Sequence, residues 1–266
     1  ILREEYKLDF QDKKVDAEKI KSYFLPNADT YKVVFVNGKL HEDLSTLGVK
    51  EGFTINTLAK AKQDANQKEI VAKHYNQIAE EASMVELNTA FNQDGLFVYV
   101  KQSVIVDKPI ELFNFATGEE DALLLQPRNL IVAEANSQVQ IIERHQSLTE
   151  NATLTNVVTE VYNSKDAMVD IYKIQANTAN ASMVDGTYFH QEERTTSSVH
   201  TIALGGKITR NNLEFYQHGS HSNSILKGIT ILEDREHVDH HTLVHHTQPN
   251  CESHQDYKGI FSDRST

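Results

Sequence analysis

Residues 138–143 read Gln-Val-Gln-Ile-Ile-Glu, and residues 167–174 read Ala-Met-Val-Asp-Ile-Tyr-Lys-Ile. Both runs alternate apolar and polar side chains, as a β-strand with one buried face requires. A valine opens a similar polar–apolar step at Val139, Val169 and Val199, thirty residues apart each time. Short strands that recur at a period of 20 to 50 residues indicate a solenoid, because each coil buries its apolar face only against the next coil. We therefore expect a mainly β protein built as a parallel β-helix.

The strand pattern is uniform from residue 129 to the end of the chain, about 140 residues without a helical period. Turns rich in Asn, Ser, Asp and Gly separate the runs, as tight turns demand. An immunoglobulin-like sandwich needs only about 100 residues, so a β-helix fits this length better. A jelly roll is the next alternative.

The first part of the chain has a different pattern. Residues 33–36 form an apolar run that meets Asn37-Gly38, the pair best suited to a type I′ hairpin turn. Between residues 61 and 82, apolar side chains recur at three- and four-residue steps, which predicts one amphipathic helix with His74 packed on or beside its apolar stripe. We therefore expect a mixed α/β region over residues 1–83, with a hairpin and one helix, and a β-helix body over residues 84–266.

The charge balance restricts the partners of the chain. Its 266 residues include 26 Lys and Arg against 38 Asp and Glu, a net charge of −12 with His neutral. Nucleic acid and anionic membranes favour a basic surface, so neither is expected as a partner. The single cysteine fits a reducing compartment. Residues 1–7 lack a signal-peptide pattern, and no apolar run approaches the roughly 20 residues of a membrane-spanning helix. We expect a cytoplasmic protein.

A histidine-rich stretch, residues 237–254, is the strongest candidate for a metal site. It holds six of the thirteen histidines and the only cysteine, and imidazole and thiolate bind borderline and soft metals. The candidate ligands are His240, His245, Cys251 and His254. Their spacing matches no common zinc motif, and strand alternation splits neighbouring rings between two faces. A cupin-like metal-binding protein is therefore one alternative, beside ordinary polar side chains on a solvent-facing sheet.

No catalytic residue is predicted. Gly205-Gly206-Lys207 lacks the frame of a P-loop, and the chain has no Gly-x-Ser-x-Gly nucleophile elbow. Cys251 has His254 nearby, but a thiolate nucleophile also needs a positioned base and an orienting group. The main enzymatic alternative is a carbohydrate-active β-helix enzyme. Such enzymes need paired carboxylates or a calcium site, and the acidic pair weighed for this role, Glu233-Asp234, lies in an expected loop.

Three segments resemble, in order, the SufB/SufD family of iron–sulfur cluster assembly proteins, and its SufD branch in particular. Each motif is of modest specificity, but their order and spacing make chance agreement improbable. The matching residues are Val34-Phe-Val-Asn-Gly38; Leu87-Asn-Thr-Ala-Phe with Asp94-Gly95; and Val238-Asp-His-His-Thr, His245, Pro249-Asn250, Ser253 and Lys258-Gly259.

The resemblance implies a right-handed β-helix and a non-catalytic scaffold role. Family members of this kind pair with SufB through their β-helices, bind the ATPase SufC through C-terminal helices, and build iron–sulfur clusters as a complex. The chain would then be a fragment, because the cluster-associated histidine motif and the SufC-binding helices would follow Thr266. We expect this chain to bind no cofactor itself. The resemblance implies that the full complex handles the iron–sulfur cluster and can include a flavin. It also implies that a homodimer of this chain would form through the β-helix.

Overall fold

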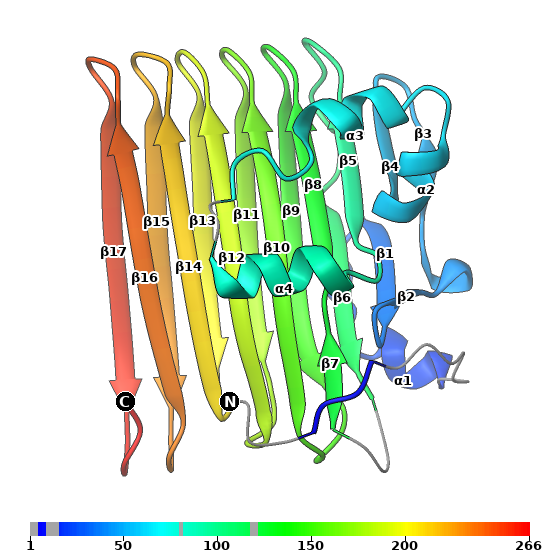
Figure 1. Ribbon diagram of the computed structural model, residues 1–266, viewed down its shortest axis with the longest axis vertical. Coiled ribbons are helices and arrows are strands. Elements are labelled where there is room, and N and C mark those ends of the chain that lie inside the picture. The colour runs from blue at the N-terminus through cyan, green and yellow to red at the C-terminus, as the bar shows by residue number, and fades with distance from the viewer. Residues whose placement is uncertain (1–4, 9–15, 80–81, 118–121) are drawn as a thin grey trace.

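A computed structural model describes residues 5–8, 16–79, 82–117 and 122–266, and consists mainly of strands (Figure 1). The first elements are α1 (Ala17–Lys21), β1 (Tyr31–Val36), β2 (Lys39–Leu40), a 3-10 helix (Glu42–Leu44), β3 (Gly48–Val49), β4 (Phe53–Thr57), α2 (Leu58–Gln63), α3 (Lys68–His74) and α4 (Ser83–Phe91). The strands that follow are β5 (Leu96–Val100), β6 (Ile110–Ala116), β7 (Leu123–Leu125), β8 (Arg128–Ala133), β9 (Gln138–Ser147), β10 (Thr153–Asn163), β11 (Met168–Ala176), β12 (Ala181–Gln191), β13 (Thr196–Leu204), β14 (Ile208–Gln217), β15 (Asn223–Leu232), β16 (His237–His246) and β17 (Glu252–Phe261).

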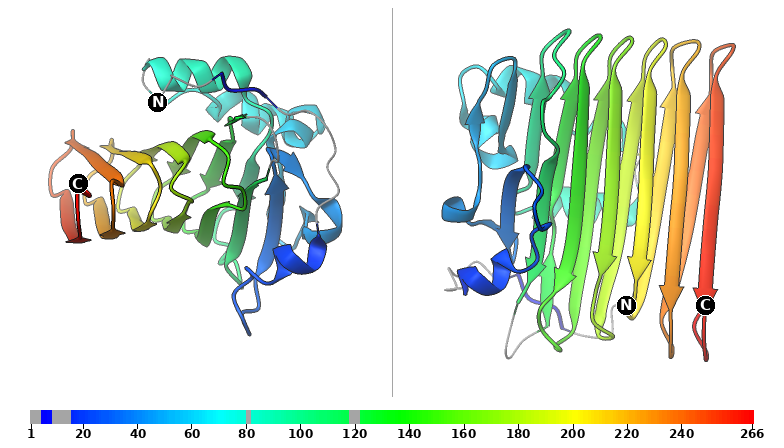
Figure 2. Two further views of the ribbon diagram at one scale, coloured as in Figure 1. Left: turned by 90° about the horizontal axis from the view of Figure 1, so that it is seen from below. Right: turned by 180° about the vertical axis from the view of Figure 1, so that it is seen from behind.

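From β8 onward, successive strands belong alternately to two sheets. This arrangement confirms the predicted parallel β-solenoid, here of about six turns. Sheet A has the order β16-β14-β12-β10-β8-β5-β4-β3, and sheet B the order β17-β15-β13-β11-β9-β6-β1-β2. From β8 and β9 onward every neighbouring pair is parallel. The two sheets face one another as two walls, seen edge-on from below in Figure 2.

The repeat that predicted the solenoid holds only approximately. Val139 pairs with Val169, as a thirty-residue coil requires. Val169, however, pairs with Ser197, and Val199 pairs with Ile171. The coils differ in length because the turns between strands differ, so a fixed period drifts out of register by two residues.

Side chains that point between the sheets form the main core. Along β9 the burial alternates at every residue, with the inward positions buried. One end of the interior is apolar and includes Val161, Val169, Phe189, Val199 and Phe215. The Phe189 and Phe215 rings stack with their centroids 4.4 Å apart, since parallel in-register strands place like side chains directly above one another.

The N-terminal hairpin is confirmed. Strands β1 and β2 are antiparallel, and the two turn residues, Asn37 and Gly38, have φ angles of 49° and 76°. A type I′ turn needs positive φ at both positions. Strand β1 also pairs in parallel with β6, so the hairpin joins sheet B directly. Helix α1 packs Ile20 on the outer face of that sheet, against Val34 and Phe113.

The single helix predicted over residues 61–82 is wrong. The segment holds α2 and α3 instead, and residues 80 and 81 of the predicted helix lie outside the described residues. A turn separates the two helices because the Asp64 carboxylate accepts the backbone N–H groups of Asn66 and Gln67. Helix α4 begins at Ser83, where the β-helix body was expected to begin. The boundary between residues 83 and 84 stays a prediction.

Helices α3 and α4 lie across the outer face of sheet A (Figures 1 and 2). We call residues 68–79, which comprise α3 and the segment after it, the cover segment. No helix within the described residues is long and apolar enough to cross a membrane.

Candidate functional site

The motif residues of α4 fasten this helix to the solenoid. The Asn88 side chain is fully buried and donates hydrogen bonds to the backbone oxygens of Pro127 (2.9 Å), just before β8, and Asn156 (2.8 Å), within β10. Asn156 returns the contact by donating to the Met84 backbone oxygen at 2.8 Å. A side chain that satisfies two backbone carbonyls at once fixes the helix in one position. The family-like asparagine is therefore a structural anchor.

Gly95 completes the same junction. A Cβ on this residue would lie 2.0 Å from the Arg128 backbone oxygen, so only glycine allows the chain to pass β8 at this distance. Asp94, the other half of the predicted Asp-Gly turn, accepts backbone N–H groups from Ala59 (2.9 Å) and Gly95 (2.8 Å). Both residues lie in irregular backbone just before β5 and are not assigned to the tight turn expected from the sequence.

A buried ion pair holds the cover segment on sheet A. Arg128 on β8 and Glu160 on β10 are each fully buried, and the Arg128 Nη2 donates to Glu160 Oε2 at 2.7 Å. The same carboxylate accepts the backbone N–H groups of Asn76 (2.7 Å), Gln77 (2.8 Å) and Ile78 (2.9 Å). Consecutive backbone donors aimed at one anion form a nest. These donors would otherwise continue α3, so Glu160 also ends that helix.

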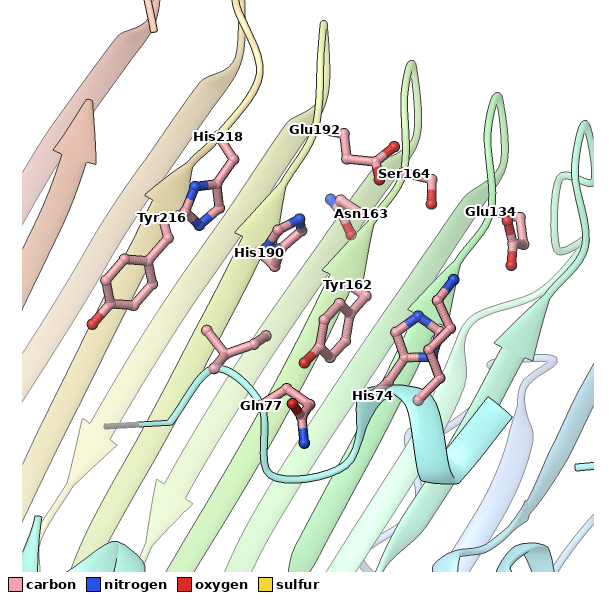
Figure 3. Close-up of a pocket in the computed structure, with 12 residues that line it drawn as sticks. His74, Gln77, Glu134, Tyr162, Asn163, Ser164, His190, Glu192, Tyr216 and His218 are labelled. Atoms are coloured by element: carbon pink, nitrogen blue, oxygen red, sulfur yellow. The ribbon is translucent and has the colours of Figure 1, made fainter. Parts of the chain in front are cut away.

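Between the cover segment and the sheet lies a pocket of about 480 Å³ (Figure 3). Its residues come from the end of α3, from the loop after it, and from the outer face and turns of β8 to β14. They are Lys73, His74, Gln77, Ile78, Glu134, Tyr162, Asn163, Ser164, His190, Glu192, Tyr216 and His218.

Aromatic and imidazole rings form a row across the floor of this pocket. Tyr162, His190, Tyr216 and His245 occupy one register position on β10, β12, β14 and β16. Ring centroids are 4.5 Å apart for His74 and Tyr162, and 5.6 Å apart for Tyr162 and His190. His190 lies 4.6 Å from His218, which follows β14. Figure 3 shows the His74, Tyr162, His190 and His218 rings following one another across the pocket.

Burial sets the protonation of the rings. Loss of solvent lowers the pKa of His74, and loss of solvent together with His218 lowers that of His190. Both rings are therefore neutral at pH 7. The His74 Nδ1 lies 2.9 Å from the Ile70 backbone oxygen, an acceptor, so Nδ1 carries the proton and Nε2 is the free base. Burial also raises the pKa of Tyr162, which stays a phenol.

A second polar constellation crosses the interior of the solenoid. Glu143 on β9 accepts a hydrogen bond from His145 Nε2 at 2.8 Å and pairs with the Lys173 ammonium at 3.0 Å. Lys173 also donates to both Asp185 oxygens, at 2.7 and 2.8 Å. All four residues are 2% exposed. Gln175 extends the chain by donating to Asp185 at 3.2 Å.

Opposite charges determine the ionisation of this interior chain. Burial alone would raise the pKa of Glu143, but the Lys173 ammonium and the His145 ring outweigh it and hold that pKa at about 2. Burial opposes the charged form of Lys173, yet the carboxylates of Asp185 and Glu143 raise its pKa above the ordinary value. The interior therefore keeps its charges at neutral pH.

His240 extends this network of hydrogen-bonded side chains toward the last coil. Gln175 and Asn211 exchange hydrogen bonds of 2.6 and 3.1 Å. Asn211 Nδ2 donates to His240 Nδ1 at 3.3 Å, and His240 Nε2 lies 2.9 Å from Thr230 Oγ1. Both ring nitrogens are thereby engaged with protein groups. Burial lowers the pKa of His240, so the ring is neutral at pH 7.

The four candidate metal ligands do not converge. His240 faces the interior, whereas His245 lies on the outer face of β16 beside Tyr216, with ring centroids 6.2 Å apart. Cys251 lies at a turn, with Sγ 3.3 Å from the Gly219 oxygen. His254 is exposed on β17, 3.5 Å from Glu252. Over the described part of the chain, no three or more His, Cys, Asp or Glu side chains are grouped to hold a metal ion.

Sequence analysis did not find the pocket. His74 was expected to be buried, and it is, but its partners on the sheet were not recognised. A signal was present: Tyr162, His190, Tyr216 and His245 recur once per coil on alternate strands. The unequal coil lengths conceal this recurrence when the sequence is searched for a fixed period.

The stacked sheets, the polar interior and the helical cover define a parallel β-solenoid protein. A family model described as "SufBD protein N-terminal region" matches residues 1–112, and one described as "SUF system FeS cluster assembly, SufBD core domain" matches residues 115–266. The chain therefore belongs to the SufB/SufD family of the SUF iron–sulfur cluster assembly system. Its assignment to the SufD branch stays a prediction.

Two curated relatives agree with this family. The chain is 25% identical over 259 residues to "Iron-sulfur cluster assembly SufBD family protein slr0076" of Synechocystis sp. (strain ATCC 27184 / PCC 6803 / Kazusa), over 94% of this chain and 57% of the relative. It is also 25% identical over 178 residues to "Protein ABCI7, chloroplastic" of Arabidopsis thaliana, over 65% of this chain and 38% of the relative. The chain thus spans less than two thirds of the length of either relative.

Proposed function

We propose that the protein is a non-catalytic scaffold subunit of the SUF complex that acts in the cytoplasm with SufB and the ATPase SufC. The observation that carries the proposal is the match of the two family models, in order, over nearly the whole chain. The carbohydrate-active alternative has no support, because Glu233 and Asp234 lie in the turn between β15 and β16.

The outermost coil provides a pairing surface. Among the described strands, β16 and β17 end their sheets, so one edge of each strand has no neighbour. Leu243, Ile260 and Phe261 on these strands are 45%, 67% and 52% exposed. An unpaired edge with apolar side chains is a template for strand addition by another chain. For the 266-residue chain, we assign self-association with a second copy to this surface.

Co-purification tests the assembly role. The full-length protein is tagged and isolated with SufB and SufC of the same organism, and the isolated complex is analysed for iron and acid-labile sulfide. Recovery of both partners with labile sulfide is the expected result. Recovery of the tagged protein alone, or with metal bound and neither partner, would overturn the proposal and favour the metal-binding alternative.

A further inference from the structure

The pocket beneath the cover segment contains a polar group that the fold does not use. The Tyr162 hydroxyl is buried and has no hydrogen-bond partner within the described structure. A buried hydroxyl without a partner costs about 1–3 kcal/mol, and the Tyr162 side chain lines a pocket that is partly open to solvent. Tyr162 remains protonated, so its oxygen can accept one hydrogen bond and its proton can be donated in another.

Carboxylates dominate the charge around this pocket. Glu134 follows β8 and Glu192 follows β12, and both line the pocket. A third carboxylate, Glu214 on β14, accepts the hydroxyl hydrogen of the lining residue Tyr216 at 2.8 Å. The lining contains one ammonium group, that of the exposed Lys73. The buried pair beneath the cover segment, Arg128 with Glu160, is neutral as a unit.

The histidine rings of the pocket carry no positive charge that would repel a cation. His74 and His190 are neutral at pH 7 because burial lowers their pKa. Neutral imidazole and phenol rings attract a planar cation through their π electrons. The protein already uses this chemistry next to the pocket, where the Arg128 guanidinium lies 5.0 Å from the Tyr75 ring centroid while it pairs with Glu160.

We propose that this pocket binds the arginine side chain of a basic segment of a partner protein. The guanidinium stacks on the row of Tyr162 and His190 and pairs with Glu192 or Glu134 at the rim. Arginine fits better than lysine, since only the guanidinium is planar and offers several donors in a fixed geometry. The volume of about 480 Å³ also accommodates backbone on either side of that arginine.

Other ligand classes fit the pocket less well. A phosphate or carboxylate would meet the two lining carboxylates, Glu134 and Glu192. A metal ion lacks a group of three or more ligands among the described residues. The net charge of −12 for the whole chain further favours a basic partner by long-range attraction. The inference does not depend on the assembly role, because it concerns a different face from the edges of β16 and β17.

N-acetyl-arginine-amide is the probe for this site, with N-acetyl-citrulline-amide as its uncharged isostere. Binding to the 266-residue chain is followed at pH 7.5 by saturation-transfer NMR and by shifts of the histidine ring protons. We expect the arginine probe to shift His190 and His218, and the citrulline probe to shift neither. Glu192→Gln should weaken the affinity about tenfold, as expected when a charge-assisted hydrogen bond is lost.

His190→Ala and His200→Ala form a matched pair. His200 stacks on Tyr172 on the outer face of sheet B, with ring centroids 4.7 Å apart. His200→Ala therefore removes a similar ring pair that lies away from the pocket. We expect His190→Ala to lose binding and His200→Ala to retain it. Equal binding of the two probes, or equal loss in both histidine variants, would overturn the proposal whether or not the SUF partners co-purify.

Discussion

Replacing Glu160 with alanine tests the clamp on the cover segment. The change leaves the fully buried Arg128 guanidinium without its carboxylate and removes the acceptor of three consecutive backbone N–H groups. Loss of one partner from a buried pair costs about 3–5 kcal/mol. The orphaned N–H groups act on the same site, so their penalties are not added separately. Against a total stability of roughly 5–15 kcal/mol, this loss is large.

The assay is urea unfolding followed by circular dichroism, combined with amide hydrogen exchange read by mass spectrometry. Glu160→Ala should lower the unfolding midpoint and deprotect residues 75–79 more than residues in β12. Glu160→Gln should lie between the wild type and Glu160→Ala, because the amide keeps one acceptor oxygen. The control is Glu18→Ala, which breaks the exposed ion pair with Lys21 on α1 and should leave the midpoint unchanged.

One outcome refutes the reasoning. If Glu160→Ala shifts the midpoint no more than Glu18→Ala and residues 75–79 stay protected, the ion pair does not hold the cover segment. The cover segment would then be held by apolar packing, such as that of Ile78 and Ala79 against Val158 and Tyr188.

Three further predictions concern the interior, the α4 junction and the sheet edge. The pKa of Glu143 is depressed from 4.5 to about 2, so the stability that its carboxylate gives the fold is complete above pH 4.5 and is lost as the pH falls toward 2. Glu143→Gln should unfold at a lower urea concentration at pH 7, and its stability should fall less steeply than that of the wild type between pH 4.5 and 2. Gly95→Ala places its Cβ 2.0 Å from a backbone oxygen of Arg128 and should cost at least about 1–3 kcal/mol in the same urea assay; an unchanged midpoint would show that the junction can relax. Light scattering should show that the 266-residue chain self-associates and that Ile260→Lys makes it monomeric. The control Val49→Lys, at the exposed edge strand β3, should leave it associated, and a wild-type chain that is monomeric at high concentration would contradict the edge proposal.

The solenoid could be predicted because its signal is local. Residues 138–143 and 167–174 largely alternate apolar and polar side chains, and in the structure burial alternates along both strands, with the inward side chains in the core. The Asn37-Gly38 turn likewise depends on two residues whose backbone preferences are independent of the rest of the chain. Features determined by adjacent residues were therefore accessible from sequence.

The cover segment and the interior chain were not accessible, because their partners lie far apart in the sequence. Glu160 ends α3 from a strand more than eighty residues away. Without that contact, residues 61–82 have a helical period throughout, which is why one long helix was predicted. Lys173 looks like an ordinary polar position on a strand, and only the facing Asp185 and Glu143 show that it is buried and charged.

The buried chain from Glu143 to His240 has a consequence for how the coils align during folding. Apolar side chains in a stacked core are nearly interchangeable, so a strand that slides by two residues still meets an apolar neighbour. Lys173 instead faces Glu143 in the register of β9 and β11, and a two-residue slip would set it opposite Ile141 or His145. A buried ammonium without its carboxylate is costly. The ionic pairs thus specify the register in which each new coil pairs with the preceding one. Hydrophobic contacts alone cannot specify this register, because the sequence is nearly repetitive.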